Sequence, residues 1–145
     1  MTSNQIAREL YNYFNSLEEE VFSNVRFLLA YQNTIKPTPV TKPIVAVSVK
    51  ECNVGNRLNK TLETGEVKLT TSRNVDTTVS MDIYLPYSSN GIEAVKIYDR
   101  IASIILFQLS KYDTLGSTCG PAEYDTSCQA IVVRTTFTIR VVTDA

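Results

Sequence analysis

The chain has 145 residues, of which 43% are hydrophobic, and its 14 basic and 15 acidic side chains leave a formal net charge of −1. This length and apolar content predict one globular domain over residues 1–145. The near-neutral charge excludes a global attraction to nucleic acid or to an anionic membrane. The opening residues lack a basic segment followed by an apolar core, so we expect no secretory signal.

The chain contains three cysteines and no histidine. Without histidine or a CxxC spacing, we expect neither a metal nor a cofactor. If Tyr124 and Cys128 face each other across a turn at residues 125–127, Cys119 lies opposite Val133, which keeps the two sulfurs apart. A Cys119–Cys128 disulfide is the alternative, but we expect reduced cysteines, in line with an intracellular protein.

The N-terminal residues 1–31 predict an amphipathic helix that begins at Ser3 or Asn4 and ends near Tyr31. Apolar residues recur three and four positions apart, as on one helical face: Ile6, Leu10, Tyr13, Phe14, Leu17, Val21, Val25, Leu28 and Leu29. The acidic run at residues 18–20 fans around such a helix instead of converging. It indicates a solvated face or a break between two helical segments.

Residues 36–43 predict a proline-rich connector. Its prolines, Pro37, Pro39 and Pro43, exclude a helix and a central strand. Because proline also pushes the preceding residue toward extended geometry, the segment is expected to be stiff. It is either a simple linker or an arm of fixed shape that lies across a partner.

The middle of the chain predicts a strand, a long loop and a hairpin. Residues 44–50 alternate like a strand with one buried face, and residues 52–65 are rich in Asn and Gly, as in a loop without a phosphate-binding pattern. A single strand over residues 66–86 would span roughly 70 Å at about 3.3 Å per residue, too long for this domain. We therefore expect a turn or bulge at residues 72–74 and a hairpin whose tip projects beyond the globule.

Residues 88–110 predict the central helix, around which the other elements pack. Apolar residues repeat at helical spacing, and Asn90 with Glu93 three positions on forms an N-cap pattern. After residue 101 the helix is almost wholly apolar, so we expect it to be surrounded. Its unbroken apolar run covers only residues 104–107, far below the roughly 18 residues that a bilayer span requires.

Residues 111–124 predict a loop and an irregular strand, and residues 129–142 alternate like a half-buried antiparallel strand. The predicted fold is an α+β two-layer domain, with a mostly antiparallel sheet over residues 44–145, two long helices on one face and a long hairpin arm. The other face is polar and meets either solvent or a subunit. It carries Thr78, Ser80, Asp82, Tyr84, Arg134, Thr136, Thr138 and Arg140.

Three stretches carry a family resemblance that covers most of the chain from about residue 36. They are PTP at 37–39 followed by KPIVAV at 42–47, TTVSMDIYLP at 77–86 before a helix, and CGPAEYD at 119–125 before the last strand. In these stretches the chain resembles the small tail terminator or tail completion proteins of Gram-positive phages and prophages. Similar proteins close the tubes of contractile, phage-tail-like bacteriocins. The segment 52–74 departs from the pattern.

The resemblance implies a structural virion protein that forms a hexameric ring on the end of a tail tube. The ring ends tube polymerisation and offers the surface to which the head connector docks. The implied partners are further copies of the chain, the tail tube protein, and the sheath or head–tail connector protein, with no sequence-specific nucleic acid and no membrane. Assembly would take place in the bacterial cytoplasm, and the product would be a virion tail or a tail-like particle.

Physical reasoning also favours a ring, because unpaired strand edges are sticky and a head-to-tail contact that closes on itself satisfies them. We expect the arm at residues 66–75 to reach the next subunit and extend its sheet. The residues expected at subunit or partner contacts are Pro37, Pro39, Pro43, Val67, Leu69, Arg73, Asp82, Tyr84, Arg134 and Arg140.

Two other classes are compatible with the sequence. One is a collar, sheath-associated or tube-initiation component of a contractile particle, which would share the ring but meet a different neighbour. The other is an enzyme or small-ligand binding domain. Its acid or base would have to be Asp82, Asp99, Glu123 or Asp125, or its nucleophile Cys119, and none has a partner at useful spacing. We therefore expect no enzyme and no catalytic residue.

Overall fold

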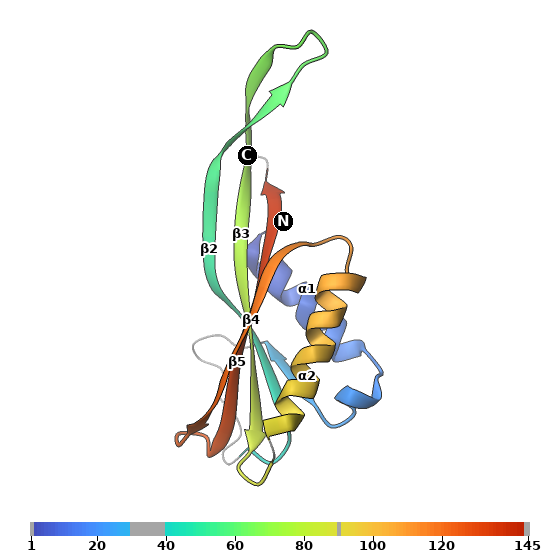
Figure 1. Ribbon diagram of the computed structural model, residues 1–145, viewed down its shortest axis with the longest axis vertical. Coiled ribbons are helices and arrows are strands. Elements are labelled where there is room, and N and C mark those ends of the chain that lie inside the picture. The colour runs from blue at the N-terminus through green and yellow to red at the C-terminus, as the bar shows by residue number, and fades with distance from the viewer. Residues whose placement is uncertain (1, 30–39, 90, 144–145) are drawn as a thin grey trace.

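The computed structural model describes residues 2–29, 40–89 and 91–143 and confirms the α+β class, with a five-stranded sheet and two α-helices in this part of the chain (Figure 1). In chain order the elements are α1 (Ser3–Ser16), the 3-10 turn η1 (Glu20–Phe22), β1 (Arg26–Leu29), β2 (Ile44–Thr61), β3 (Val67–Pro86), α2 (Gly91–Ser103), the π-helical turn η2 (Ile104–Gln108), β4 (Asp113–Asp125) and β5 (Ala130–Thr143).

The strands lie in the order β1-β2-β3-β5-β4. β1 runs parallel to β2, and every other neighbouring pair is antiparallel. β1 covers only residues 44–47 of β2. The borders of the sheet are therefore β4 on one side and, beyond the reach of β1, β2 on the other.

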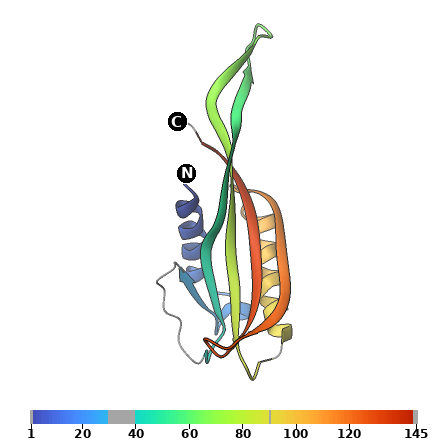
Figure 2. The ribbon, with the colours of Figure 1, turned by 90° about the vertical axis from the view of Figure 1, so that its left-hand side faces the viewer.

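Alternating residues of β2, β3 and β5 build the main core, because side chains along a strand point to opposite faces. Val47, Met81, Ile83 and Ile139 are fully buried in it. Both helices contribute to the same core and lie on the same side of the sheet (Figures 1 and 2). Their buried residues are Ile6, Ala7, Leu10 and Phe14 from α1, Ala94, Ile97 and Ile101 from α2, and Ile104 and Ile105 from η2.

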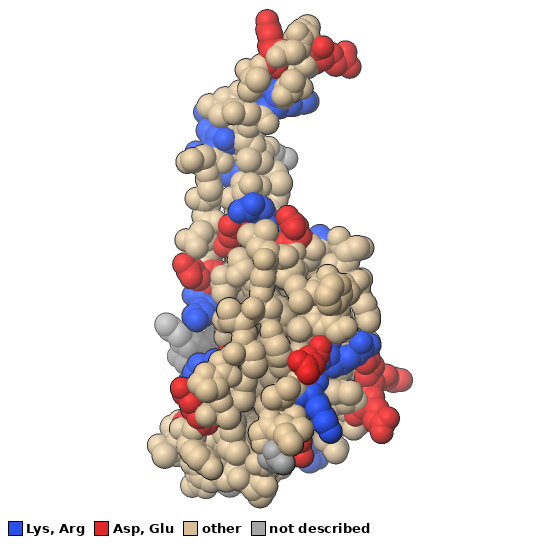
Figure 3. Space-filling model, viewed as in Figure 1, with Lys and Arg blue, Asp and Glu red and all other residues tan. Residues whose placement is uncertain are grey.

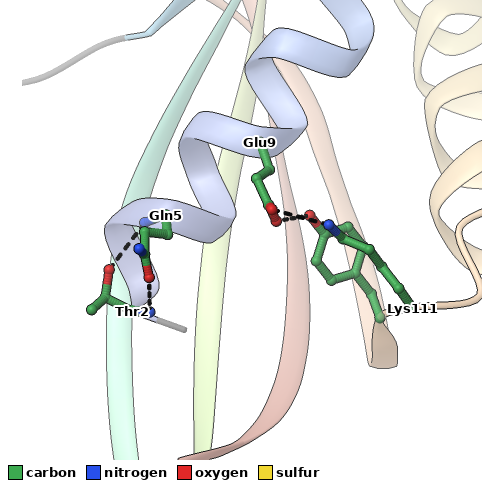
Figure 4. Close-up of polar contacts among 5 residues, drawn as sticks. Thr2, Gln5, Glu9 and Lys111 are labelled. Carbon is green, nitrogen blue, oxygen red and sulfur yellow. Dashed lines mark hydrogen bonds and ion pairs between the residues drawn. The ribbon is translucent and has the colours of Figure 1, made fainter.

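The N-terminal helix is shorter than expected. Thr2 caps it, because the Thr2 hydroxyl accepts a hydrogen bond from Gln5 N–H and the Gln5 side-chain oxygen accepts one from Thr2 N–H (Figure 4). The helix ends at Ser16. The prediction of helix as far as Tyr31 is wrong over residues 17–29, and residues 30 and 31 lie outside the described ones. The break left open at residues 18–20 is present, because the chain turns there and returns as β1, which places Phe27 against Phe14.

The β2–β3 hairpin differs most from expectation. Residues 52–61 form a strand instead of a loop, and the chain turns at residues 62–66, where Gly65 adopts a positive φ of 86°. Residues 72–74 are no turn, because β3 runs through them. A bulge lies close by, since Arg57 pairs with Arg73 but Asn59 pairs with Leu69. Cross-strand pairing thus overrides the weak strand preference of the Asn and Gly residues.

The last elements follow the sequence more closely. The described helix covers residues 91–108, while the expected cap Asn90 lies outside the described residues. β5 alternates as predicted. Cys119 pairs with Thr135 instead of Val133, and Tyr124 with Ile131, because the turn is longer and a bulge falls between Cys119 and Ala122. All three cysteines lie within the described residues and carry thiols instead of disulfide bonds.

Candidate subunit interface

The far end of the β2–β3 hairpin, residues 56–73, is called the arm below. Among the described residues a third strand meets the arm only at its base, where Thr143 of β5 lies opposite Arg73. Within the arm Val67 is 64% and Leu69 50% exposed. Because two strands without a packed face are only marginally stable in water, a contact with another molecule would stabilise the arm.

The arm has an ordered distribution of charge. Arg57 lies opposite Arg73, and Lys60 lies opposite Lys68. Directly opposed like charges destabilise a strand pair. The arginines have an internal role, because Arg57 Nε donates to the Thr70 carbonyl at 2.7 Å and Arg73 Nη1 to the Gly55 carbonyl at 2.9 Å. Acidic side chains, Glu63 and Glu66, occupy the tip, beyond the basic ones (Figure 3).

The two borders of the sheet offer unpaired backbone groups. Among the described residues, no strand lies beside β2 from Ser48 onward or along the outer side of β4. β4 has two bulges, one of them containing Pro121. Bulges and proline are features that restrict edge-to-edge pairing to selected positions. Any lateral contact therefore has to accommodate the bulges of these borders.

The sheet face opposite the helices is held together by its own polar pairs. Arg140 contacts both carboxylate oxygens of Asp76, at 2.7 and 3.0 Å, and this hydrogen bonding lowers the pKa of Asp76. Arg134 lies 3.3 Å from Asp82. Tyr84 is buried in a second, small core on this face, with Val40, Ile44, Ala46, Cys128, Ala130 and Val132.

The residues predicted at contacts thus fall into separate places. Val67, Leu69 and Arg73 lie together on the arm. Asp82, Arg134 and Arg140 lie on the open sheet face, where all three are in ion pairs. Tyr84 is only 3% exposed, which contradicts its assignment to a contact surface. Pro43 is half-buried beside β1, where its carbonyl accepts from Arg26 N–H at 2.9 Å, and Pro37 and Pro39 lie outside the described residues.

Sequence reasoning missed the β2 half of the arm and both borders. Val54 is 62% exposed near the base of the arm, and Arg57 and Lys60 complete the opposed basic pairs. An available signal was the similar length of residues 54–61 (eight) and 67–75 (nine), which flank the turn residues Glu63, Thr64 and Gly65.

Two of the groups considered for catalysis, Cys119 and Asp99, lie close enough to interact electrostatically. Asp125 accepts hydrogen bonds from Ser127, which lower its pKa, and burial together with Asp99 raises the pKa of the Cys119 thiol. A raised thiol pKa leaves less of the nucleophilic thiolate. Within the described ranges no group of three or more acidic, cysteine or histidine side chains could hold a metal.

A hollow of about 310 Å³ lies between α2 and the segment that joins η1 to β1. It contains none of the groups considered for catalysis. Its lining residues are Val21, Ser23, Asn24, Val25, Pro43, Glu93, Lys96 and Ile97.

A polar cluster ties α1 to the start of β4. Glu9 accepts hydrogen bonds from the Tyr112 hydroxyl at 2.7 Å and from Lys111 Nζ at 3.0 Å (Figure 4). Tyr112 first and Lys111 second lower the pKa of Glu9. The pKa of Tyr112 is raised by burial and by Glu9. These pKa shifts arise from the fold, because Tyr112 and Lys111 both donate hydrogen bonds to the Glu9 carboxylate.

Replacing Glu9 by Gln is therefore expected to weaken folding in a pH-dependent way. A depressed carboxyl pKa contributes stability above the unfolded value of about 4.3, and this contribution is lost as pH falls through the lower folded value. At pH 7 we expect a loss of about 1 kcal/mol, since water screens these partly exposed groups. Urea unfolding should show this difference at pH 7 and almost none at pH 3. The matched change Glu18→Gln, at an exposed residue, should have no effect at either pH.

No protein-family model matches the chain, and none of the curated proteins matches it. None of the described helices combines the length and apolar character needed to cross a membrane.

Proposed function

We propose that this chain is a structural subunit of a phage tail or phage-tail-like particle, in which copies form a ring that caps the end of the tail tube. The observation that carries the proposal is the arm. Residues 56–73 extend beyond the packed domain, bury almost nothing within their own chain and expose Val67 and Leu69. Such an extension gains stability only through another molecule.

The layout of the domain supports assembly as its role. With two helices beneath one face of the sheet, the domain has two layers, and its free borders and arm face outward. A head-to-tail contact between different borders generates a closed ring when the rotation between subunits closes. In the proposed assembly the arm reaches the next subunit, and six copies form the ring.

The ring acts by shape. It covers the growing end of the tube, so further tube subunits have no surface to bind, and its outer side receives the connector or the sheath. A collar, sheath-associated or tube-initiation component would form a similar ring at another position. Labelling the protein on intact particles separates these roles.

Light scattering and negative-stain imaging of the purified full-length chain test the proposal. We expect a ring of about six subunits at micromolar concentration. We also expect shorter tubes when the ring is added to polymerising tail tube protein, and heat-denatured chain serves as the control. A protein that stays monomeric at high concentration and leaves tube length unchanged would contradict the proposal.

A further inference from the structure

The two free borders of the sheet match each other row by row. Asn53 of β2 pairs with Asp76, Asp76 pairs with Arg140, and Arg140 pairs with Asp113 of β4. These residues form one row across the sheet. Ser48, Ser80, Thr136 and Thr118 form another row in the same way. Residues 48–53 and 113–118 therefore lie at the same height on opposite borders.

The irregularities of the two borders compensate each other. β2 has one extra residue, Lys50, where its register shifts between Val49 and Glu51. β4 has one extra residue, Leu115, between Thr114 and Gly116. An extra residue in one border alone would put any pairing out of register, since a slip by one residue turns every side chain to the other face. With one in each, the two segments have equal length and can pair without interruption.

The free part of each border ends at the same height. β1 occupies the edge of β2 over residues 44–47. In the neighbouring rows β4 bulges between Cys119 and Ala122, around Pro121. At the other end β4 begins at Asp113, which lies in the row of Asn53. Both borders are thus free over the same rows, and each contains a single bulge there.

The strand directions also agree. Successive neighbours from β2 through β3 and β5 to β4 are antiparallel, so β2 and β4 run in opposite directions. Rotation about an axis along the strands preserves direction and introduces no rise, so β4 of one copy would meet β2 of the next antiparallel and at equal height. α1 packs beneath β1 and β2, and α2 packs beneath β3, β5 and β4, so both borders have a helix on the same side of the sheet and the helical layer would continue across the junction.

The side chains at the end of the junction are chemically compatible. Asn53 and Asp113 are both exposed, and both belong to the open face, in one row with Asp76 and Arg140. An amide group donates two hydrogen bonds and a carboxylate accepts several. Asn53 Nδ2 uses one of its hydrogens on Glu51 Oε1, at 3.0 Å, and the other remains for the carboxylate of a neighbour.

We propose that residues 48–53 of one copy pair antiparallel with residues 113–118 of a second copy. Asn53 then lies opposite Asp113 and Ser48 opposite Thr118, and the sheet becomes continuous around the ring. This inference rests on the proposed function and names the surface through which neighbouring subunits meet.

Cysteine cross-linking of the full-length chain tests the pairing. In a C52S/C119S background, which removes the exposed thiols, we introduce N53C with D113C, or S48C with T118C. Directly opposed residues have Cβ atoms about 4.5–5.5 Å apart, close to the roughly 3.5–4.5 Å of a disulfide. Mild oxidation should link most chains into a ladder that reaches the mass of the ring on a non-reducing gel, and a reductant should reverse it.

The matched control is N53C with T118C, both exposed and on the same face but four rows, or about 13 Å, out of register. It should give no ladder, nor should any of the single-cysteine variants. Rings that form normally without a ladder in either paired variant would overturn the inferred pairing and leave the proposed function standing. Equal ladders in the paired and mismatched variants would overturn the register. A chain that forms no ring overturns the proposed function itself, and the pairing with it.

Discussion

Removal of residues 56–73 is expected to yield a folded protein that no longer assembles into rings. The deletion joins Gly55 to Asn74, between Val54 and Val75, which lie directly opposite each other in the intact sheet. A two-residue Gly-Asn connection suits a tight hairpin turn. No member of either core cluster lies in the deleted segment, so the domain should keep its thermal unfolding transition.

The expected loss of assembly has a physical reason. Stable protein interfaces bury about 1,200–2,000 Å² in total, more than the pairing of two short borders supplies. The arm would add the exposed side chains of Val67 and Leu69 to the contact. Light scattering should therefore report a monomer for the deletion variant and a ring for the intact chain, at matched micromolar concentrations.

A milder variant serves as the matched control. V67T/L69T keeps two strand-compatible residues in the arm but removes their exposed apolar surface. We expect rings that dissociate at a higher concentration than those of the intact chain. If the armless protein still forms rings of the same subunit number, the arm takes no part in the subunit contact.

Phe14→Ala is expected to cause the largest loss of folding stability, about 3–5 kcal/mol. Phe14 is 1% exposed. Its ring stacks on Phe27 at 5.6 Å between centroids and meets Phe22 edge-on at 5.9 Å. The side chain thus joins α1 to η1 and β1. Because small domains have a total stability of about 5–15 kcal/mol, the variant should unfold at a much lower urea concentration.

Asn15→Ala provides the control for that measurement. Asn15 is the next residue of α1 and is exposed, and surface substitutions of this kind usually stay within about 0.5 kcal/mol. A loss below about 1 kcal/mol for Phe14→Ala would mean that the aromatic cluster does not hold the N-terminal segment to the sheet.

Periodicity within a segment was enough to predict much of the domain. The alternation along β5 identifies Val133, Phe137 and Ile139 as core residues, and all three are buried. Helical spacing correctly predicts the central helix and the burial of Ile101, Ile104 and Ile105. It is wrong for Ile92 and Val95, which share that spacing but are 58% and 51% exposed, and Phe107, in the half expected to be surrounded, is 82% exposed. These elements are predictable because each buries one face, so apolar residues recur at a regular spacing along the sequence. The α+β class follows from their order.

Long-range pairing decided the rest. The apolar spacing of Val25, Leu28 and Leu29 fits a helix, but β2 offers a strand edge, and residues 26–29 pair with it as β1. Residues 52–61 have a loop-like composition and become a strand because β3 satisfies their backbone. The free borders could not be predicted from the sequence either, because the equal length of residues 48–53 and 113–118 depends on bulges in two strands that are far apart in the chain. Local composition determined which residues are buried in each element, and only the tertiary structure decided which backbone groups remain unpaired, because a strand edge is defined by the absence of a neighbour.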